Sequence, residues 1–139
     1  MTTIAWDGKT LAADTLCAGS FRMQNVVKIF KVKKDLVGFS GDMQEGYSFL
    51  EWYKAGCKPD EKPTITGSFS GIVVRGSRCY WVESNLIPAE VHDGRYALGT
   101  GSDFAMAAMY CGKTAKEAVE IAIYFDVHSG GEVTTLTTK

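Results

Sequence analysis

Short apolar stretches bounded by turn-forming residues recur along the chain, and longer stretches between them repeat their apolar residues every third or fourth position. The short stretches are typical of strands, whereas the longer pattern is typical of helices with one buried face. A stretch at 86–91 contains Pro88, which restricts it to an edge of a sheet. The other strands are predicted at residues 2–6, 10–14, 26–32, 36–40, 69–75, 78–83, 96–98 and 133–138.

End signals and residue spacing together predict the helices. Asp42 with Glu45 resembles a capping box, in which two side chains satisfy backbone groups at a helix start, and Thr114 with Glu117 has the full form of that motif. The polar stretch 58–67 contains two prolines and is predicted to be a loop. Helices are expected at residues 42–55, 103–111 and 115–125.

Tight turns such as those at 7–8 and 76–77 join most of the predicted strands, so neighbouring strands are expected to be antiparallel. The 139 residues are too few for two full domains. With 45% apolar and 22% charged residues, the composition is typical of a soluble globular protein. The expected fold class is α+β, in a single domain over residues 1–139, with helices packed on the faces of antiparallel sheets.

The charge and the cysteines of the chain exclude several classes of function. Lys and Arg number 15 against 16 Asp and Glu, so no positive excess exists to neutralise phosphates, and no nucleic-acid partner is expected. No apolar run is long enough for a membrane span, and the N-terminus lacks the pattern of a secretion signal. Four cysteines without metal or redox spacing then predict free thiols in a cytoplasmic protein.

Two further patterns carry no function in this interpretation. Residues 107–114 read AAMYCGKT, a loose match to a phosphate-binding loop. Such a loop needs a strand before it, whereas the preceding residues predict a helix, so the end of one helix and the start of the next is the preferred interpretation. His92 and His128 have no partner at ligand spacing, so neither a metal site nor a cofactor is expected.

The N-terminus carries the first candidate for catalysis. Met1 precedes Thr2, and a methionine before a small residue is commonly removed in the cytosol. Removal leaves a threonine whose hydroxyl and free α-amine belong to one residue. An α-amine has a pKa of about 7.7–8.0 and can act as general base for the hydroxyl, so nucleophile and base form one unit. Taken alone, this start is weak evidence, because many proteins begin Met-Thr and such a terminus is usually just solvated.

Six short segments, in order along the chain, resemble segments of one enzyme family. They are residues 2–4 (TTI), 11–14 (LAAD), 25–29 (NVVKI), 37–42 (VGFSGD), 97–101 (ALGTG) and 126–131 (DVHSGG). Each segment alone is common, but together they resemble the proteasome β-subunit family and its bacterial relative, the HslV peptidase. The resemblance implies a four-layer αββα sandwich of the N-terminal-nucleophile hydrolases, with two antiparallel sheets between helices.

The resemblance also implies roles for single residues, and three of them concern the nucleophile. Thr2 would attack a peptide carbonyl through its hydroxyl, forming an acyl-enzyme that water then hydrolyses. Lys28 would lie beside that hydroxyl, where its charge favours the alkoxide. Asp14 would pair with Lys28, because a buried lysine needs a counter-ion.

The remaining implied roles concern the amine and the substrate oxygen. Thr100, which replaces a serine of the family, and Ser129 would bond to the α-amine and relay its proton. Asp126 would orient Ser129 and help to hold the amine. N–H groups near Ser40 and Gly41 would form the oxyanion hole. Each residue also has an ordinary structural interpretation, such as a turn or a surface charge, and it is their joint occurrence that favours a site.

The chain departs from the family in one element. The family has two long helices after its first strands, whereas only 42–55 is predicted here, so one helix of the family is missing. The sheet surface beneath it then needs another cover, which puts ring assembly through these helices in doubt. Phe49, Trp52 or Tyr53, if exposed, are candidates for a different subunit contact.

Three functions remain open at this point. The first is a threonine endopeptidase that cleaves peptides or unfolded proteins as a homo-oligomer, with an AAA+ unfoldase as a possible partner. The second is a catalytically silent scaffold or binding protein of the same fold that retains Met1. The third keeps the chemistry but hydrolyses a small amide. Exchange of Thr2 separates the second function from the other two, and a comparison of peptide with small-amide substrates separates those.

Overall fold

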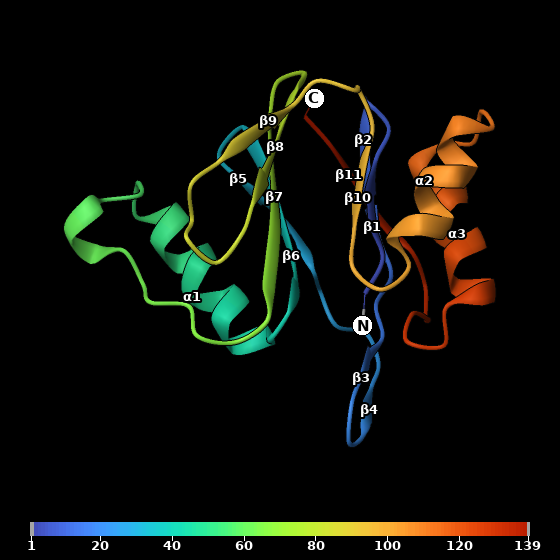
Figure 1. Cartoon of the computed structure of the whole chain (residues 1–139), viewed down its shortest axis with the longest axis horizontal. Coiled ribbons are helices and arrows are strands. Elements are labelled where there is room, and N and C mark those ends of the chain that lie inside the picture. Colours follow the sequence, from blue (N-terminus) through green and yellow to red (C-terminus); the bar gives the residue numbers. More distant parts are fainter. Residues whose placement is uncertain (1, 139) are drawn as a thin grey trace.

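The structure, a computed structural model, describes residues 2–138 and consists of four layers (Figure 1). Helix α1 (Met43–Lys54) covers the outer face of a five-stranded sheet. Helices α2 (Ser102–Tyr110) and α3 (Ala115–Phe125) cover the outer face of a four-stranded sheet. The inner faces of the two sheets pack against each other. This arrangement confirms the predicted αββα sandwich with two antiparallel sheets.

The five-stranded sheet contains the two hairpins that the turn signals predict, β5–β6 and β7–β8, whereas β6 and β7 are joined through α1. Its strand order is β5-β6-β7-β8-β9, and every neighbouring pair is antiparallel. Strand β9 follows Pro88 directly and lies at an edge, as expected. The bounds are β5 (Ile29–Val32), β6 (Asp35–Gly41), β7 (Phe69–Arg75), β8 (Arg78–Val82) and β9 (Ala89–Val91).

The four-stranded sheet has the order β10-β1-β2-β11, so two segments far along the chain flank the N-terminal hairpin. Its strands are β10 (Tyr96–Leu98), β1 (Ile4–Trp6), β2 (Thr10–Ala13) and β11 (Thr134–Thr137). A separate hairpin of β3 (Cys17–Ala18) and β4 (Arg22–Met23) projects below the sheets in Figure 1. The hairpin was not predicted, because its short strands are not deeply buried and carry no apolar pattern.

The start of β5 also differs from the prediction. The strand begins at Ile29, not at residue 26. Asn25 has a positive φ of 59°, and the N–H of Val26 donates to the carbonyl of Thr15 at 2.9 Å. Residues 26–28 therefore follow the segment after β2 before the chain enters the sheet, and this path brings Lys28 into the interior.

The core between the sheets follows from the alternation of side chains along each strand. Ile4, Trp6 and Leu11 of one sheet pack against Leu36 and Ile72 of the other, and all five are almost fully buried. The opposite face of the four-stranded sheet presents small residues to α2 and α3, so the helices lie close to it. These residues are Ala5, Ala12 and Ala97.

The two predicted capping boxes have different outcomes. Thr114 and Glu117 form the complete motif, with each side chain bonded to the other's backbone N–H. Asp42 accepts from the N–H groups of Gln44 and Glu45, as an N-cap should. The Glu45 carboxylate does not return to residue 42, because it accepts three bonds from residues 66–67 instead. The second half of that box is therefore wrong, and Glu45 fixes the loop against α1.

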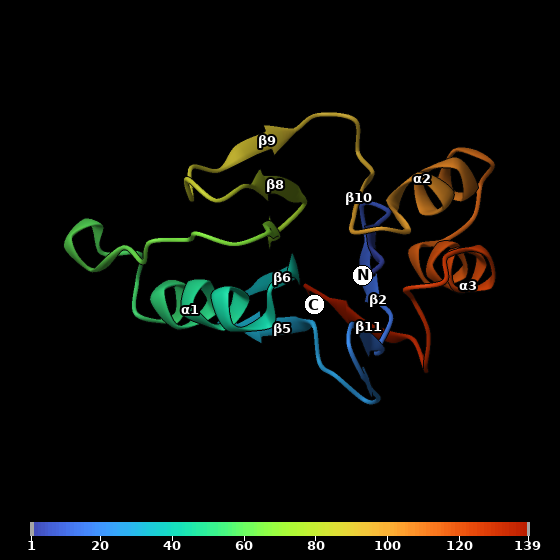
Figure 2. The same cartoon turned by 60° about the horizontal axis from the view of Figure 1, so that its bottom comes forward.

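The outer face of the five-stranded sheet is covered by one long helix, α1, as predicted. Within residues 2–138, the stretch 58–67 contains only the single-turn helix η1 (Pro59–Glu61). Figure 2 shows α1 beside β5 and β6, with no helix beside β8 and β9. A pocket of about 160 Å³, lined largely by apolar residues of α1, β7 and β8, remains on this side.

The suggestion that Phe49 and Tyr53 are exposed is wrong. Phe49 is 2% exposed and Tyr53 is 9% exposed, because both pack onto the sheet in the cluster that includes Phe69 and Val73. Trp52 is half-buried, and its indole N–H donates to the carbonyl of Lys58 at 2.8 Å. These aromatic side chains cover the sheet of their own chain, so they do not form a free contact surface.

The segment that resembles a phosphate-binding loop has the structural role preferred above. Residues 107–114 form the end of α2 and the turn into α3. The residues before Gly112 are helical, so no strand feeds this turn. Among the described residues, no helix is long and apolar enough to cross a membrane.

Replacing Gly46 by alanine is expected to destabilise the protein by about 1–3 kcal/mol, as overpacking of a core does. On an exposed helix surface the same change stabilises by about 1 kcal/mol. Here a Cβ at Gly46 of α1 would overlap the ring of Phe39, which is fully buried. Denaturant unfolding measures the change. Gly19→Ala, where a Cβ meets no atom within 4 Å, is the control and should leave stability unchanged.

Candidate active site

Thr2 lies at the entrance to β1, where the chain turns into the four-stranded sheet. The residue is 3% exposed, and its main-chain nitrogen donates to Thr100 Oγ1 at 3.3 Å. Its carbonyl accepts from the N–H of Gly101 at 3.2 Å. Gly99 has a φ of +96°, and a side chain there would collide with the Thr2 carbonyl. The glycine turn after β10 is therefore what brings Thr100 to Thr2.

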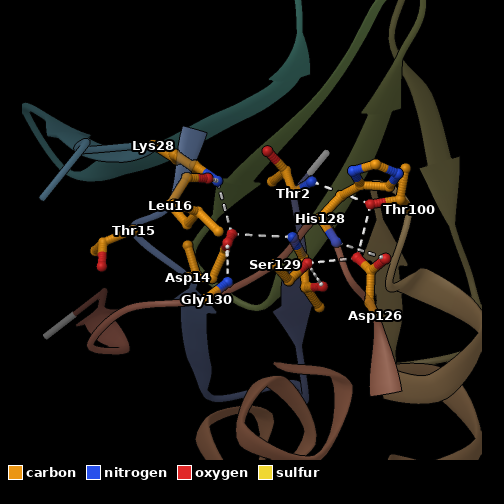
Figure 3. A network of polar contacts seen from close by, with 12 residues as sticks. Thr2, Asp14, Thr15, Leu16, Lys28, Thr100, Asp126, His128, Ser129 and Gly130 are labelled. Carbon is orange, nitrogen blue, oxygen red and sulfur yellow. Dashed lines mark hydrogen bonds and ion pairs between the residues drawn. The ribbon is translucent and has the colours of Figure 1, made fainter. Parts of the chain in front are cut away.

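Lys28 and Asp14 form a buried ion pair beside Thr2 (Figure 3). Both side chains are fully buried, and Lys28 Nζ lies 2.8 Å from Asp14 Oδ1. The ammonium also donates to the carbonyl of Leu16 at 2.5 Å. Burial lowers the pKa of Lys28 below its ordinary value of 10.5, against the opposing effect of the Asp14 carboxylate. The lysine is thus held in one position without contact with solvent.

Asp14 is itself fixed by backbone donors. The N–H of Thr3 donates to its Oδ1 at 3.0 Å, and the N–H of Gly130 donates to its Oδ2 at 2.9 Å. Asp14 follows β2 directly, whereas Gly130 belongs to the segment after α3. One carboxylate therefore ties the ends of two distant segments to the lysine.

Asp126 forms the second charged centre of the site, at the C-terminal end of α3. Its Oδ2 accepts from Thr100 Oγ1 at 2.7 Å and from Ser129 Oγ at 2.5 Å, and its Oδ1 accepts from the N–H of His128 at 3.2 Å. Burial alone raises the pKa of Asp126, but these donors outweigh it and place the pKa below the ordinary value of 3.8. The carboxylate is therefore ionised at neutral pH.

The structure brings together the six residues predicted for catalysis. Figure 3 shows Thr2 between the Lys28–Asp14 pair on one side and the Thr100, Asp126 and Ser129 side chains on the other. The six residues come from the starts or ends of β1, β2, β5, α2 and α3, which meet at one end of the sandwich. Their chemical roles remain a prediction.

Ser40 and Gly41, predicted for the oxyanion hole, lie at the end of β6. Both belong to the ladder with β7, where they face Ser70 and Phe69. Gly41 has a φ of +100°, and a side chain there would collide with the carbonyl of Ser68. The strand therefore turns sharply at this point into the N-cap of α1. Their role at a substrate oxygen also remains a prediction.

Comparison with known proteins identifies the fold. No protein-family model matches the chain, and no curated protein sequence matches it. Eukaryotic HslV from Trypanosoma brucei superposes on it with a TM-score of 0.77 at 22% identity, covering 97% of this chain and 98% of that chain. The fold is that of HslV. BPH of Thiobacillus denitrificans in complex with epoxomicin gives a TM-score of 0.76 at 21% identity, covering 98% of this chain and 97% of that chain.

In this HslV fold the site includes groups that the sequence did not single out. Thr3 is fully buried, and its Oγ1 lies 2.7 Å from Ser129 Oγ. The carbonyl of Leu16 and the N–H groups of His128 and Gly130 complete the bonding of the charged residues. Backbone groups are present at every residue and leave no signal in a sequence. Only the position of Thr3, between Thr2 and a buried strand, could have indicated it.

Asp126→Asn is expected to flatten the loss of stability in acid. The pKa of Asp126 is lower in the folded protein than in the unfolded chain, so the folded state favours the carboxylate. That contribution is complete above pH 3.8, the ordinary pKa, and is lost as the pH falls through the lowered value. Denaturant unfolding of both proteins from pH 6 downwards should give free energies that converge. A constant difference at every pH would contradict the assignment.

Proposed function

We propose that the protein is a threonine-type peptidase that acts through Thr2 once Met1, which lies outside the described residues, has been removed. One observation carries the proposal: a buried lysine–aspartate pair and a carboxylate with two hydroxyl donors converge on Thr2, the second residue of the sequence. A structural ion pair alone needs no second carboxylate beside it. In the proposed reaction both centres have a use, since the ammonium favours negative charge on the Thr2 hydroxyl oxygen and the second carboxylate favours the protonated amine.

The bonding pattern supports the amine as general base. Thr100 donates its one proton to Asp126, so its oxygen is free to accept, and it accepts from the Thr2 nitrogen at 3.3 Å. In a chain that begins at Thr2 this nitrogen is an amine, and the bond leaves its lone pair available for the proton of the Thr2 hydroxyl. Asp126, kept ionised, favours the protonated amine that results.

Lys28 supports the other half of the reaction. Its ammonium, fixed by Asp14 and the Leu16 carbonyl, favours negative charge on the Thr2 oxygen as the hydroxyl proton leaves. The oxygen attacks the substrate carbonyl and forms an acyl-enzyme. The protonated amine then gives its proton to the leaving amine, and water hydrolyses the ester by the same route. Backbone N–H groups near Ser40 and Gly41 serve as the oxyanion hole in this proposal.

The fold supports the proposals on substrate and assembly. The substrate is a peptide or an unfolded protein, and the protein acts in the cytoplasm as a homo-oligomer that encloses its sites. An AAA+ unfoldase is the partner that unfolds folded substrates for it. The missing helix beside β8 and β9 means that subunit contacts differ from those formed through two such helices. Analytical ultracentrifugation of the purified protein tests the homo-oligomer, and a monomer at micromolar concentration would count against it.

The intact mass of the protein purified from its natural host is the first test of the function. A mass smaller by one methionine residue makes Thr2 the terminus. A peptide boronate, which bonds to nucleophilic hydroxyls, should then inhibit the cleavage of unfolded proteins. Thr2 should be the residue to which the boronate bonds. A mass that retains Met1 excludes the self-activated nucleophile and favours a silent scaffold. Turnover of small amides without peptide cleavage assigns the other hydrolase class.

A further inference from the structure

We propose that Thr3 is a positioning residue that sets the direction of the hydroxyl bonds around Asp126 and couples this carboxylate to the Lys28–Asp14 pair. The proposal rests on the proposed function, because it assigns Thr3 a part in the reaction of Thr2. It concerns a residue outside the six that the resemblance implies.

Thr3 contacts both charged centres of the site. Its N–H donates to Asp14 Oδ1 at 3.0 Å, and its carbonyl accepts from the N–H of Asp14 at 3.1 Å. Its hydroxyl lies 2.7 Å from Ser129 Oγ, and Ser129 Oγ lies 2.5 Å from Asp126 Oδ2. Thr3 is fully buried, so no water competes for these bonds. The residue next to the nucleophile therefore joins the two carboxylates through its backbone and its side chain.

The direction of these hydroxyl bonds follows from the number of protons. A hydroxyl has one proton to donate. Ser129 gives its proton to the Asp126 carboxylate, which can only accept, so Ser129 cannot also donate to Thr3. Thr3 must be the donor in its bond with Ser129. On the other side, Thr100 also donates to Asp126 and accepts from the Thr2 nitrogen. Two chains of donors, one from Thr3 and one from Thr2, thus end on the same Asp126 Oδ2.

This polarity gives the Thr3 hydroxyl a function beyond packing. By donating to Ser129 it directs the serine proton onto Asp126 and strengthens that bond, since linked hydrogen bonds polarise one another. When Asp126 accepts strong hydrogen bonds, its carboxylate stays ionised. It then keeps the Thr100 hydroxyl oriented so that its oxygen accepts from the Thr2 amine. Without the Thr3 hydroxyl, Ser129 can rotate, and Asp126 loses part of its support. The amine then loses its fixed orientation over the hydroxyl.

The test compares Thr3→Ala with Thr3→Ser, two variants that differ from each other only by the hydroxyl. Thr3→Ala should lower kcat by between about tenfold and a hundredfold with little change in KM, as misplacement of reacting groups does. It should also move the acid limb of the pH–rate profile to higher pH. Thr3→Ser should restore both. The ionisable groups around Asp126, namely Lys28, Asp14, the Thr2 amine and His128, are the same in both variants.

A second readout does not depend on activity. The N–H of His128 donates to Asp126 Oδ1, so its NMR chemical shift reports the protonation of that carboxylate. The midpoint of this titration should lie at higher pH in Thr3→Ala than in Thr3→Ser. The matched control is Thr66→Val, which removes an exposed hydroxyl bonded to Glu45 and should change neither readout.

The outcomes separate the two proposals. If the wild-type protein cleaves nothing, the peptidase proposal fails, but a shifted His128 titration still supports the role of Thr3. Equal kcat and equal titration midpoints in the alanine and serine variants overturn the role of Thr3 and leave the peptidase proposal intact. If Thr3→Ala does not fold, Thr3→Val takes its place in the comparison with Thr3→Ser. Valine also lacks the hydroxyl but fills the volume of the threonine side chain.

Discussion

Thr2→Ala is expected to lower the rate of peptide cleavage by roughly a thousandfold or more, since loss of a nucleophile removes the covalent route entirely. The change deletes the hydroxyl and one methyl group. The nitrogen keeps its bond to Thr100, and the carbonyl keeps its bond from Gly101. Lys28 keeps Asp14 and the Leu16 carbonyl as partners, and Asp126 keeps its two hydroxyl donors. The fold should therefore persist, and the loss should appear in kcat.

Cleavage of an unfolded protein by variants that begin at residue 2 measures this effect, with thermal unfolding as the check on the fold. Thr2→Ser is the control, because it keeps the hydroxyl and the amine. It should retain cleavage within about tenfold, as expected for a nucleophile that keeps its base. Substantial cleavage by the alanine variant would refute the assignment of the nucleophile and direct attention to another residue of the site.

Asp14→Ala is expected to lower the free energy of unfolding by about 3–5 kcal/mol, which is the usual cost of leaving one charge of a buried pair without its partner. Asp14 compensates the fully buried Lys28 at 2.8 Å. It also accepts from the N–H groups of Thr3 and Gly130, which lose their partner in the variant. The loss should exceed that for any exposed ion pair of the chain.

Denaturant unfolding provides the measurement, with two comparisons. Glu51→Ala breaks the exposed pair with Lys54, whose atoms lie 3.2 Å apart, and should change stability by less than about 1 kcal/mol. The double variant Asp14→Ala, Lys28→Met removes both charges and should recover part of the loss, because the uncompensated ammonium is gone. A double variant less stable than Asp14→Ala alone would show that the penalty does not come from the buried charge.

The elements were predictable where their signals are local. The Thr114 capping box and the apolar spacing of α3 gave its start and end correctly, since both signals lie within the helix itself. The β3–β4 hairpin was not predicted, because its residues form strands only through their pairing with each other and are not deeply buried. Glu45 was assigned to the wrong partner for the same reason: its actual partners, residues 66–67, lie on a loop that only the packed structure brings to α1.

The sequence by itself determined which chemical groups are available. It placed a threonine behind Met1, supplied Lys28 and the carboxylates, and indicated the antiparallel sandwich through turns and short apolar strands, because these features depend on residue type and on near neighbours. Only the tertiary structure decided how the groups combine. It buried Lys28 against Asp14, turned Phe49 and Tyr53 onto their own sheet, and fixed Thr3 between two carboxylates. Burial and hydrogen-bond direction depend on segments far apart in the chain, and no local pattern records them.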